Sequence, residues 1–278
     1  MNAIEIKNLS KKYTGFLLKD ISFTLPSGYI MGLVGENGAG KTTIIKLILD
    51  MIKRDNGTIT VLGKDNKDHF EFTKQDIGVV LDEIGISGFL KANQIDKIMK
   101  NIFTNWYSDV FYNYLKKLSV PTDKKFKEFS KGMKMKMGIA IALSHQPKLL
   151  ILDEATSGLD PVVRDEFTDI LSDFTRDENH SVLISSHIVS DLEKVCDYIT
   201  FIHSGELILC EEKDRLYEKY CIVQCSESDL YKIDSSAIIS KKISPYGAEA
   251  VAEKSKLPSD LKTMPVDIER LFISMTRR

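Results

Sequence analysis

The sequence predicts an α/β protein built around a largely parallel β-sheet, and three observations support this. Short apolar runs that suit buried strands alternate along the chain with segments of helical periodicity, an order typical of parallel sheets. One apolar run, residues 29–34, leads into a glycine-rich turn and then a helix. Another, residues 149–152, is fully apolar and ends on two acidic residues.

Length and composition restrict the class of protein. The chain has 278 residues, 43% of them hydrophobic, which suffices for one large or two smaller domains with a sizeable core. Its 38 basic and 40 acidic side chains leave a net charge of −2, which excludes a polycationic nucleic-acid tail. No apolar stretch approaches the roughly 18 residues that span a bilayer, and the N-terminus lacks a signal-peptide pattern. We therefore expect a cytoplasmic protein, and any role at a membrane would depend on a partner protein.

The first third of the chain indicates mixed strands with one helix. Alternation of apolar and polar residues marks the strands, and Asp55-Asn56-Gly57 is a turn signal. The expected elements are, in order, strands at residues 2–7, 20–25 and 29–34, a helix from 41 to about 51, and strands at 58–62 and 77–81.

A helical insertion is expected within the core, at about residues 85–145. From Phe89 to Leu118 apolar residues recur at helical spacing until Pro121 interrupts the pattern, and many of them are aromatic. This aromatic stripe is either the core of the insertion or a contact surface for a partner. The expected elements that follow are helices at 133–144 and from 161, the strand 181–185 and the helix 188–196.

The pattern changes after about Cys210. A charged helix at 211–220, a β-like run at 221–225 and an amphipathic segment at 267–275 follow, with scattered proline and serine between them. We therefore expect a first domain at residues 1–210 and a small α/β accessory domain at residues 211–278.

A phosphate-binding loop is the strongest functional signal. Residues 35–42 fit G-x-x-x-x-G-K-[ST] between a predicted strand and a predicted helix. The glycines let successive backbone N–H groups converge on phosphate oxygens, and the helix directs its positive end toward the same anion. Lys41 would reach the β- and γ-phosphates, and the Thr42 hydroxyl would ligate Mg²⁺. The nucleotide-binding residues expected here are Gly35, Glu36, Asn37, Gly38, Ala39, Gly40, Lys41, Thr42 and Thr43.

Two acidic residues supply the second half of such a site. Asp153 and Glu154 end the apolar strand, where Asp153 would hold Mg²⁺ through water. Glu154 is placed to polarise the attacking water as a general base. The alternative is that both acids only cap the strand end in solvent.

The motifs around the acidic pair distinguish among the classes of phosphate-loop protein. GTPase-like strings occur at residues 73–76 and 82–85, but in the reverse of the usual order, so we treat them as coincidence. Phe-Ser-Lys-Gly-Met at 129–133 precedes the acidic pair, Ser-Gly-Leu-Asp at 157–160 follows it, and His187 ends the next strand. This set, in this order, resembles the ATP-binding cassette (ABC) transporter ATPases over about residues 2–210.

The resemblance implies a fold and a set of roles. The fold is a P-loop NTPase core of the ABC ATPase type with an antiparallel β subdomain, the helical insertion and the small C-terminal α/β appendage. Tyr13 would stack on the adenine ring, and Ser130 with Gly132 would contact the γ-phosphate bound by the opposite subunit. Asp160 would lie at the dimer interface, and His187, counted with Glu154 and Lys41 as catalytic, would hydrogen-bond the γ-phosphate. The alternatives are a strand-end aromatic for Tyr13, a helix cap for Asp160 and a satisfied strand-end histidine for His187.

Two departures from the family pattern stand out. Lys131 replaces the first glycine of the usual Leu-Ser-Gly-Gly-Gln, and Met133 replaces its glutamine. Asp82 occupies the position of a glutamine that senses Mg²⁺ and the permease. A carboxylate can accept a hydrogen bond from metal-bound water but cannot donate one as an amide does. We therefore place Asp82 with Thr42 and Asp153 at the expected metal site.

The resemblance also implies partners. Each ATP would be clamped between Lys41 of one subunit and Ser130 of another, in a homodimer or in a heterodimer with a second ABC ATPase. Transmembrane permease subunits would receive the motion, which places the chain at the inner face of the cell membrane, and no direct nucleic-acid contact is expected. Similarity to bacterial single-cassette exporters of the bacitracin and phenol-soluble-modulin types implies a peptide, drug or related substrate.

Two rival functions are weighed against this one. A soluble ABC ATPase that acts on nucleic acid or ribosomes mostly carries two cassettes or a long coiled coil, whereas this chain has one glycine loop and a short insertion. A non-hydrolysing regulatory subunit is disfavoured by the intact Glu154 and His187.

Lysine is concentrated between residues 116 and 136. This stretch contains eight lysines and two acidic residues, a local excess of 8 − 2 = +6 positive charges within a chain whose net charge is −2. Two interpretations are open: the run is an ordinary solvated face, or it attracts ATP toward Ser130 and Gly132.

Overall fold

A six-stranded sheet forms the centre of the molecule, because three of its strands are apolar enough to be buried on both faces. Every residue of β3 (Ile30–Val34), β7 (Leu149–Asp153) and β8 (Ser181–Ser186) is buried. The order is β10 (Glu206–Glu212), β9 (Tyr198–His203), β3, β8, β7 and β6 (Ile77–Val80), all parallel except β10. This computed structural model describes the whole chain except residues 69, 157–158, 246, 259–260 and 278.

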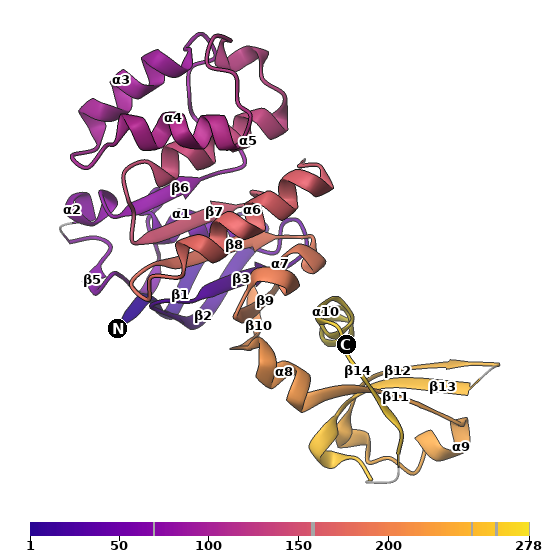
Figure 1. Cartoon of the computed structure of the whole chain (residues 1–278). Coiled ribbons are helices and arrows are strands. Elements are labelled where there is room, and N and C mark those ends of the chain that lie inside the picture. The colour runs from indigo at the N-terminus through magenta and orange to yellow at the C-terminus, as the bar shows by residue number, and fades with distance from the viewer. Residues whose placement is uncertain (69, 157–158, 246, 259–260, 278) are drawn as a thin grey trace.

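An antiparallel sheet lies beside the first, with α1 (Lys41–Ile48) between them (Figure 1). Apolar residues of α1, such as Ile44 and Ile48, share one buried cluster with residues of both sheets. The first two strands run well beyond the predicted ranges, since register shifts let their pairing continue to the hairpin at Tyr13 and Phe16. The sheet order is β2 (Phe16–Pro26), β1 (Asn2–Tyr13), β4 (Asn56–Val61) and β5 (Lys64–Asp65).

Helices cover the other face of the parallel sheet (Figure 1). In α6 (Pro161–Phe174) the Asp160 side chain accepts a hydrogen bond from the Val163 amide, and Phe167, Ile170 and Leu171 are buried as their spacing predicts. The short helices α2 (Phe70–Lys74) and α7 (Val189–Val195) complete the core.

The insertion contains three helices, α3 (Ala92–Ile102), α4 (Ser108–Lys117) and α5 (Lys131–Leu143). The helical pattern of residues 89–118 is therefore broken between α3 and α4. Phe103 adopts an extended backbone and stacks on His145, with ring centroids 3.9 Å apart, and the Trp106 indole donates to Asp96 over 2.8 Å. These tertiary contacts outweigh local helix propensity. Buried Trp106 and Phe111 show that part of the aromatic stripe is the insertion's own core.

The C-terminal segment forms a third sheet, which projects from the rest of the chain (Figure 1). Its strands are β12 (Ile238–Ser244), β13 (Gly247–Glu253), β11 (Tyr220–Cys225) and β14 (Thr263–Pro265), with α8 (Lys213–Lys219) and α9 (Glu227–Leu230) beside them. The sequence predicted only β11 among these strands. β10 also runs past the expected boundary at residue 210.

The last helix, α10 (Ile268–Thr276), packs back on the core. Its Phe272 ring meets Phe201 of β9 edge to face, with centroids 5.2 Å apart. Glu193 of α7 accepts hydrogen bonds from the Tyr217 hydroxyl, over 2.7 Å, and from the Ile268 amide. The C-terminal segment is thus tied to the core of the molecule at both of its ends. Among the helices that the structure describes, none has the length and apolar character to cross a membrane.

Candidate functional site

The glycine-rich loop joins the end of β3 to the start of α1, as the motif predicts. Gly40, at the helix N-cap, has a φ of 114°, a left-handed conformation that favours glycine. Gly35 is required for a different reason, because a β-carbon there would lie 2.5 Å from the carbonyl oxygen of Ile202 in β9. The loop conformation therefore depends on both its own glycines and the neighbouring strand.

Lys41 is the first residue of α1, and its side chain is only 5% exposed. Its Nζ donates to the carbonyl oxygens of Gly35, over 2.6 Å, and of Glu36, over 3.2 Å. The same ammonium lies 3.2 Å from Oε1 of Glu154. The charge of this buried group is thus compensated inside the site, as burial requires.

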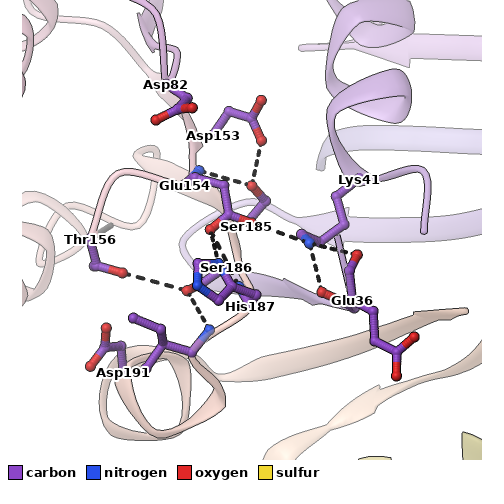
Figure 2. Close-up of polar contacts among 12 residues, drawn as sticks. Glu36, Lys41, Asp82, Asp153, Glu154, Thr156, Ser185, Ser186, His187 and Asp191 are labelled. Atoms are coloured by element: carbon purple, nitrogen blue, oxygen red, sulfur yellow. Dashed lines mark hydrogen bonds and ion pairs between the residues drawn. The ribbon is translucent and has the colours of Figure 1, made fainter. Parts of the chain in front are cut away.

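The acidic pair lies at the end of β7, next to β8 (Figure 2). The Ser185 hydroxyl of β8 donates to Asp153 over 2.6 Å and accepts from the Glu154 amide over 3.0 Å. Glu154 has a φ of 53°, a left-handed conformation that is uncommon for a residue with a side chain. The sequence analysis did not single out Ser185, although it lies in the predicted strand 181–185.

His187 follows β8 and completes the group. Its Nδ1 lies 2.6 Å from Oε2 of Glu154, so the two carboxylate oxygens of Glu154 face Lys41 and His187 respectively (Figure 2). Lys41 and His187, which come from two other segments of the chain, therefore both contact Glu154.

A pocket of about 780 Å³ opens beside Lys41 and Glu154, and His187 is not among its lining residues. Its walls include most of the predicted loop and helix-start residues together with the acidic pair, namely Glu36, Asn37, Gly38, Gly40, Lys41, Thr42, Thr43, Asp153 and Glu154. The predicted residues Gly35 and Ala39 are not among its lining residues. Phe16, which the sequence analysis did not single out, lines the pocket, whereas Tyr13 is not among its lining residues. Tyr13 pairs with Phe16 across the β1–β2 hairpin and is 42% exposed.

The predicted metal ligands Thr42, Asp82 and Asp153 all line this pocket. A hydroxyl and two carboxylates are hard oxygen donors, which fit Mg²⁺ together with phosphate and water oxygens. The described residues contain no group of three or more His, Cys, Asp and Glu side chains that could hold a metal without such help.

The remaining predicted residues lie away from the pocket. Ser130 caps α5, since its hydroxyl accepts from the Met133 amide over 3.2 Å, and Gly132 is in the first turn of that helix. Asp160 caps α6, as its alternative interpretation expects. Ser157 and Gly158 lie outside the described residues. Within one chain, none of Ser130, Gly132 and Asp160 lines the pocket.

Comparisons with known proteins agree with this arrangement. The family model described as "ABC transporter" matches residues 18–157. The ABC transporter ATP-binding protein YtrB of Bacillus subtilis is 30% identical over 98% of this chain and 97% of its own length. The bacitracin transport ATP-binding protein BcrA of Enterococcus faecalis is 32% identical over 74% of this chain and 68% of its own. A solved ATP-binding subunit of an ABC transporter superposes with a TM-score of 0.69 at 25% identity, covering 78% of this chain and 92% of that one.

Proposed function

The chain belongs to the ABC transporter family as an ATP-binding subunit, and from this premise we propose that it powers export of a peptide, a drug or a related substrate through separate membrane subunits. As a member of this family it binds and hydrolyses ATP. The choice of substrate is supported by similarity to a relative named for bacitracin transport. The observation that carries the catalytic part is the contact of Glu154 with both Lys41 and His187 beside the pocket.

We propose that Lys41 binds the β- and γ-phosphates and that Glu154 acts as the general base. With Lys41 drawn onto phosphate oxygens, Oε1 of Glu154 becomes available to accept a proton from the attacking water. His187 holds the other carboxylate oxygen at 2.6 Å, so it keeps Glu154 oriented. We propose that its imidazole contacts the γ-phosphate once the nucleotide is bound. The Glu154 side chain is only 14% exposed, which limits competition from bulk water.

Thr42, Asp153 and Asp82 would hold Mg²⁺. The ion, when bound, neutralises part of the negative charge on the phosphate oxygens. Ser185 fixes the Asp153 carboxylate by its 2.6 Å hydrogen bond, which leaves the carboxylate oriented before the metal arrives. Tyr13 and its hairpin partner Phe16 are the aromatic side chains proposed for the adenine ring, and Phe16 lies at the pocket wall.

The site would be completed by a second subunit, identical or homologous. Ser130 and Gly132 lie at the N-terminus of α5, where backbone N–H groups favour an anion, yet they do not line the pocket of their own chain. Asp160 would add to the interface. Because no described helix can cross a membrane, association with the inner face of the membrane would occur through the permease.

Replacement of Glu154 by glutamine tests the proposed chemistry. We expect Glu154→Gln to abolish steady-state ATP hydrolysis while ATP-dependent dimers accumulate, since the amide cannot take the proton. Phosphate release and size-exclusion chromatography with light scattering measure the two effects. Glu178→Gln, a change of the same kind at an exposed residue, should hydrolyse ATP normally. A Glu154→Gln chain with normal turnover would refute the assignment.

A further inference from the structure

Two residues at which this chain departs from the family pattern contact each other. Nζ of Lys131 lies 2.7 Å from Oδ1 of Asp82. Asp82 follows the end of β6 in the core, and Lys131 is the first residue of α5 in the insertion. The two substitutions therefore form one ion pair between the nucleotide pocket and the loop that holds Ser130.

Asp82 lies at the boundary between two pockets of opposite charge. On one side is the nucleotide pocket, where the carboxylates of Glu36, Asp82, Glu83, Asp153 and Glu154 outnumber the ammonium groups of Lys41 and Lys46. On the other is a pocket of about 580 Å³ whose walls include Lys127, Lys131 and Lys134 as well as Asp82 and Glu83. The positive end of α5 adds to the lysine side of this boundary.

The pair can open at low cost. The Lys131 and Asp82 side chains are 54% and 49% exposed, and an ion pair so accessible to water contributes little to stability. A nucleoside triphosphate carries several negative charges, so it attracts the lysine ammonium group more strongly than a single carboxylate does. Lys131 adjoins Ser130, which is the residue proposed to meet the nucleotide of the opposite subunit.

We propose that Lys131 is a further nucleotide-binding residue, which contacts the triphosphate held by the second subunit, and that Asp82 positions it until that nucleotide arrives. This inference rests on the proposed two-subunit site. Lys131 exchanges one anionic partner, Asp82 of its own chain, for another, the phosphates of the opposing ATP. Closure of the dimer thereby separates α5 from Asp82 and releases the carboxylate toward its own nucleotide pocket.

The test measures ATP-dependent dimerisation by analytical ultracentrifugation in the Glu154→Gln background, where dimers should accumulate. Adding Lys131→Gln should raise the dimer dissociation constant about a hundredfold, because a dimer of identical chains loses two charged phosphate contacts, each contributing about tenfold. Lys131→Arg, which keeps the charge, and Lys124→Gln, which removes an exposed charge from the same lysine run, should dimerise like the parent. A Lys131→Gln chain that dimerises as well as the parent would overturn the inference. A parent that forms no dimer with ATP would instead refute the two-subunit site.

Exchanging the charges of Asp82 and Lys131 distinguishes a nucleotide-binding role of Lys131 from a purely structural role of the ion pair. In Asp82→Lys combined with Lys131→Asp the ion pair can form in reverse, but the residue beside Ser130 is now acidic. We expect the exchanged chain to dimerise more weakly than Asp82→Lys alone, which carries the same change at the proposed metal site, while binding of a fluorescent ATP analogue to the Lys131→Gln monomer remains at the parental level. Recovery of dimerisation in the exchanged chain would show that the pair only braces α5, and would reject the nucleotide-binding role.

Discussion

Lys41 and Glu154 are directly paired, with Nζ of the lysine 3.2 Å from Oε1 of the glutamate. The residue proposed to bind phosphate is thus ion-paired with the residue proposed to activate water. Both side chains are largely buried, and His187 holds the second oxygen of Glu154. A triphosphate that enters the pocket must replace this internal anion, so ATP binding itself would prepare the general base.

Lys41→Ala should weaken ATP binding by at least about tenfold, because a hydrogen bond to a charged group contributes about 1.5–3 kcal/mol. Isothermal titration calorimetry with the purified chain measures the affinity. Lys53→Ala, an exposed lysine beyond α1, is the matched control and should bind ATP normally. Unchanged affinity in Lys41→Ala would contradict the role of the lysine.

A mixture of two inactive variants should regain activity if each site is shared. Ser130→Arg and Lys41→Ala chains are each expected to be inactive alone. A heterodimer of them combines the intact Lys41 of one chain with the intact Ser130 of the other in one of its two sites. An equal mixture should therefore reach about a quarter of the normal rate, if all dimers form equally and the sites act independently.

The ATPase rate of the mixture, followed as the ratio of the two chains is varied, checks this expectation. Activity that stays at the level of the separate variants at every ratio would mean that each chain carries a self-contained site.

Gly35→Ala should destabilise the folded chain by about 1–3 kcal/mol, as forced overpacking does. The added carbon would lie 2.5 Å from the Ile202 carbonyl oxygen, so the loop or β9 must shift. Urea unfolding gives the free energy. Gly85→Ala, where nothing lies within 4 Å of the added carbon, should leave it nearly unchanged. Equal stability of the two variants would argue against the close approach of loop and strand.

Phe272→Ala should lower the free energy of unfolding by about 3–5 kcal/mol, the usual cost of removing a buried aromatic ring. Phe272 is 7% exposed and packs on Phe201 of the core, whereas the adjacent Ile273 is 38% exposed. Ile273→Ala is therefore the control and should cost much less. If the two variants unfold at the same urea concentration, the docking of α10 does not contribute to stability.

The phosphate loop and the acidic pair could be predicted from the sequence because their signals are local. Residues 35–42 carry their geometry in three closely spaced glycines, and Asp153 and Glu154 follow a short apolar run that suits a buried strand. The alternation of strands and helices likewise indicated the parallel sheet. Membership of the ABC family followed from the order of these short motifs along the chain.

Elements whose stability comes from pairing escaped prediction. β12 is rich in serine and lysine, and its hydrogen bonds to β13 hold it as a strand. The break between α3 and α4 likewise accompanies the stacking of Phe103 on His145, a residue far along the chain, which no local pattern records.

The sequence by itself determined which residues can bind a nucleotide, since that chemistry lies in the residue types and their spacing. Only the tertiary structure decided which of them meet. Parallel pairing of β3, β7 and β8 brings Lys41, Glu154 and His187 together at one sheet edge, because all three follow the carboxyl ends of these strands. The pairing of Asp82 with Lys131 likewise depends on how the insertion folds back on the core. Such contacts between distant segments are set by the global packing, so the linear pattern does not contain them.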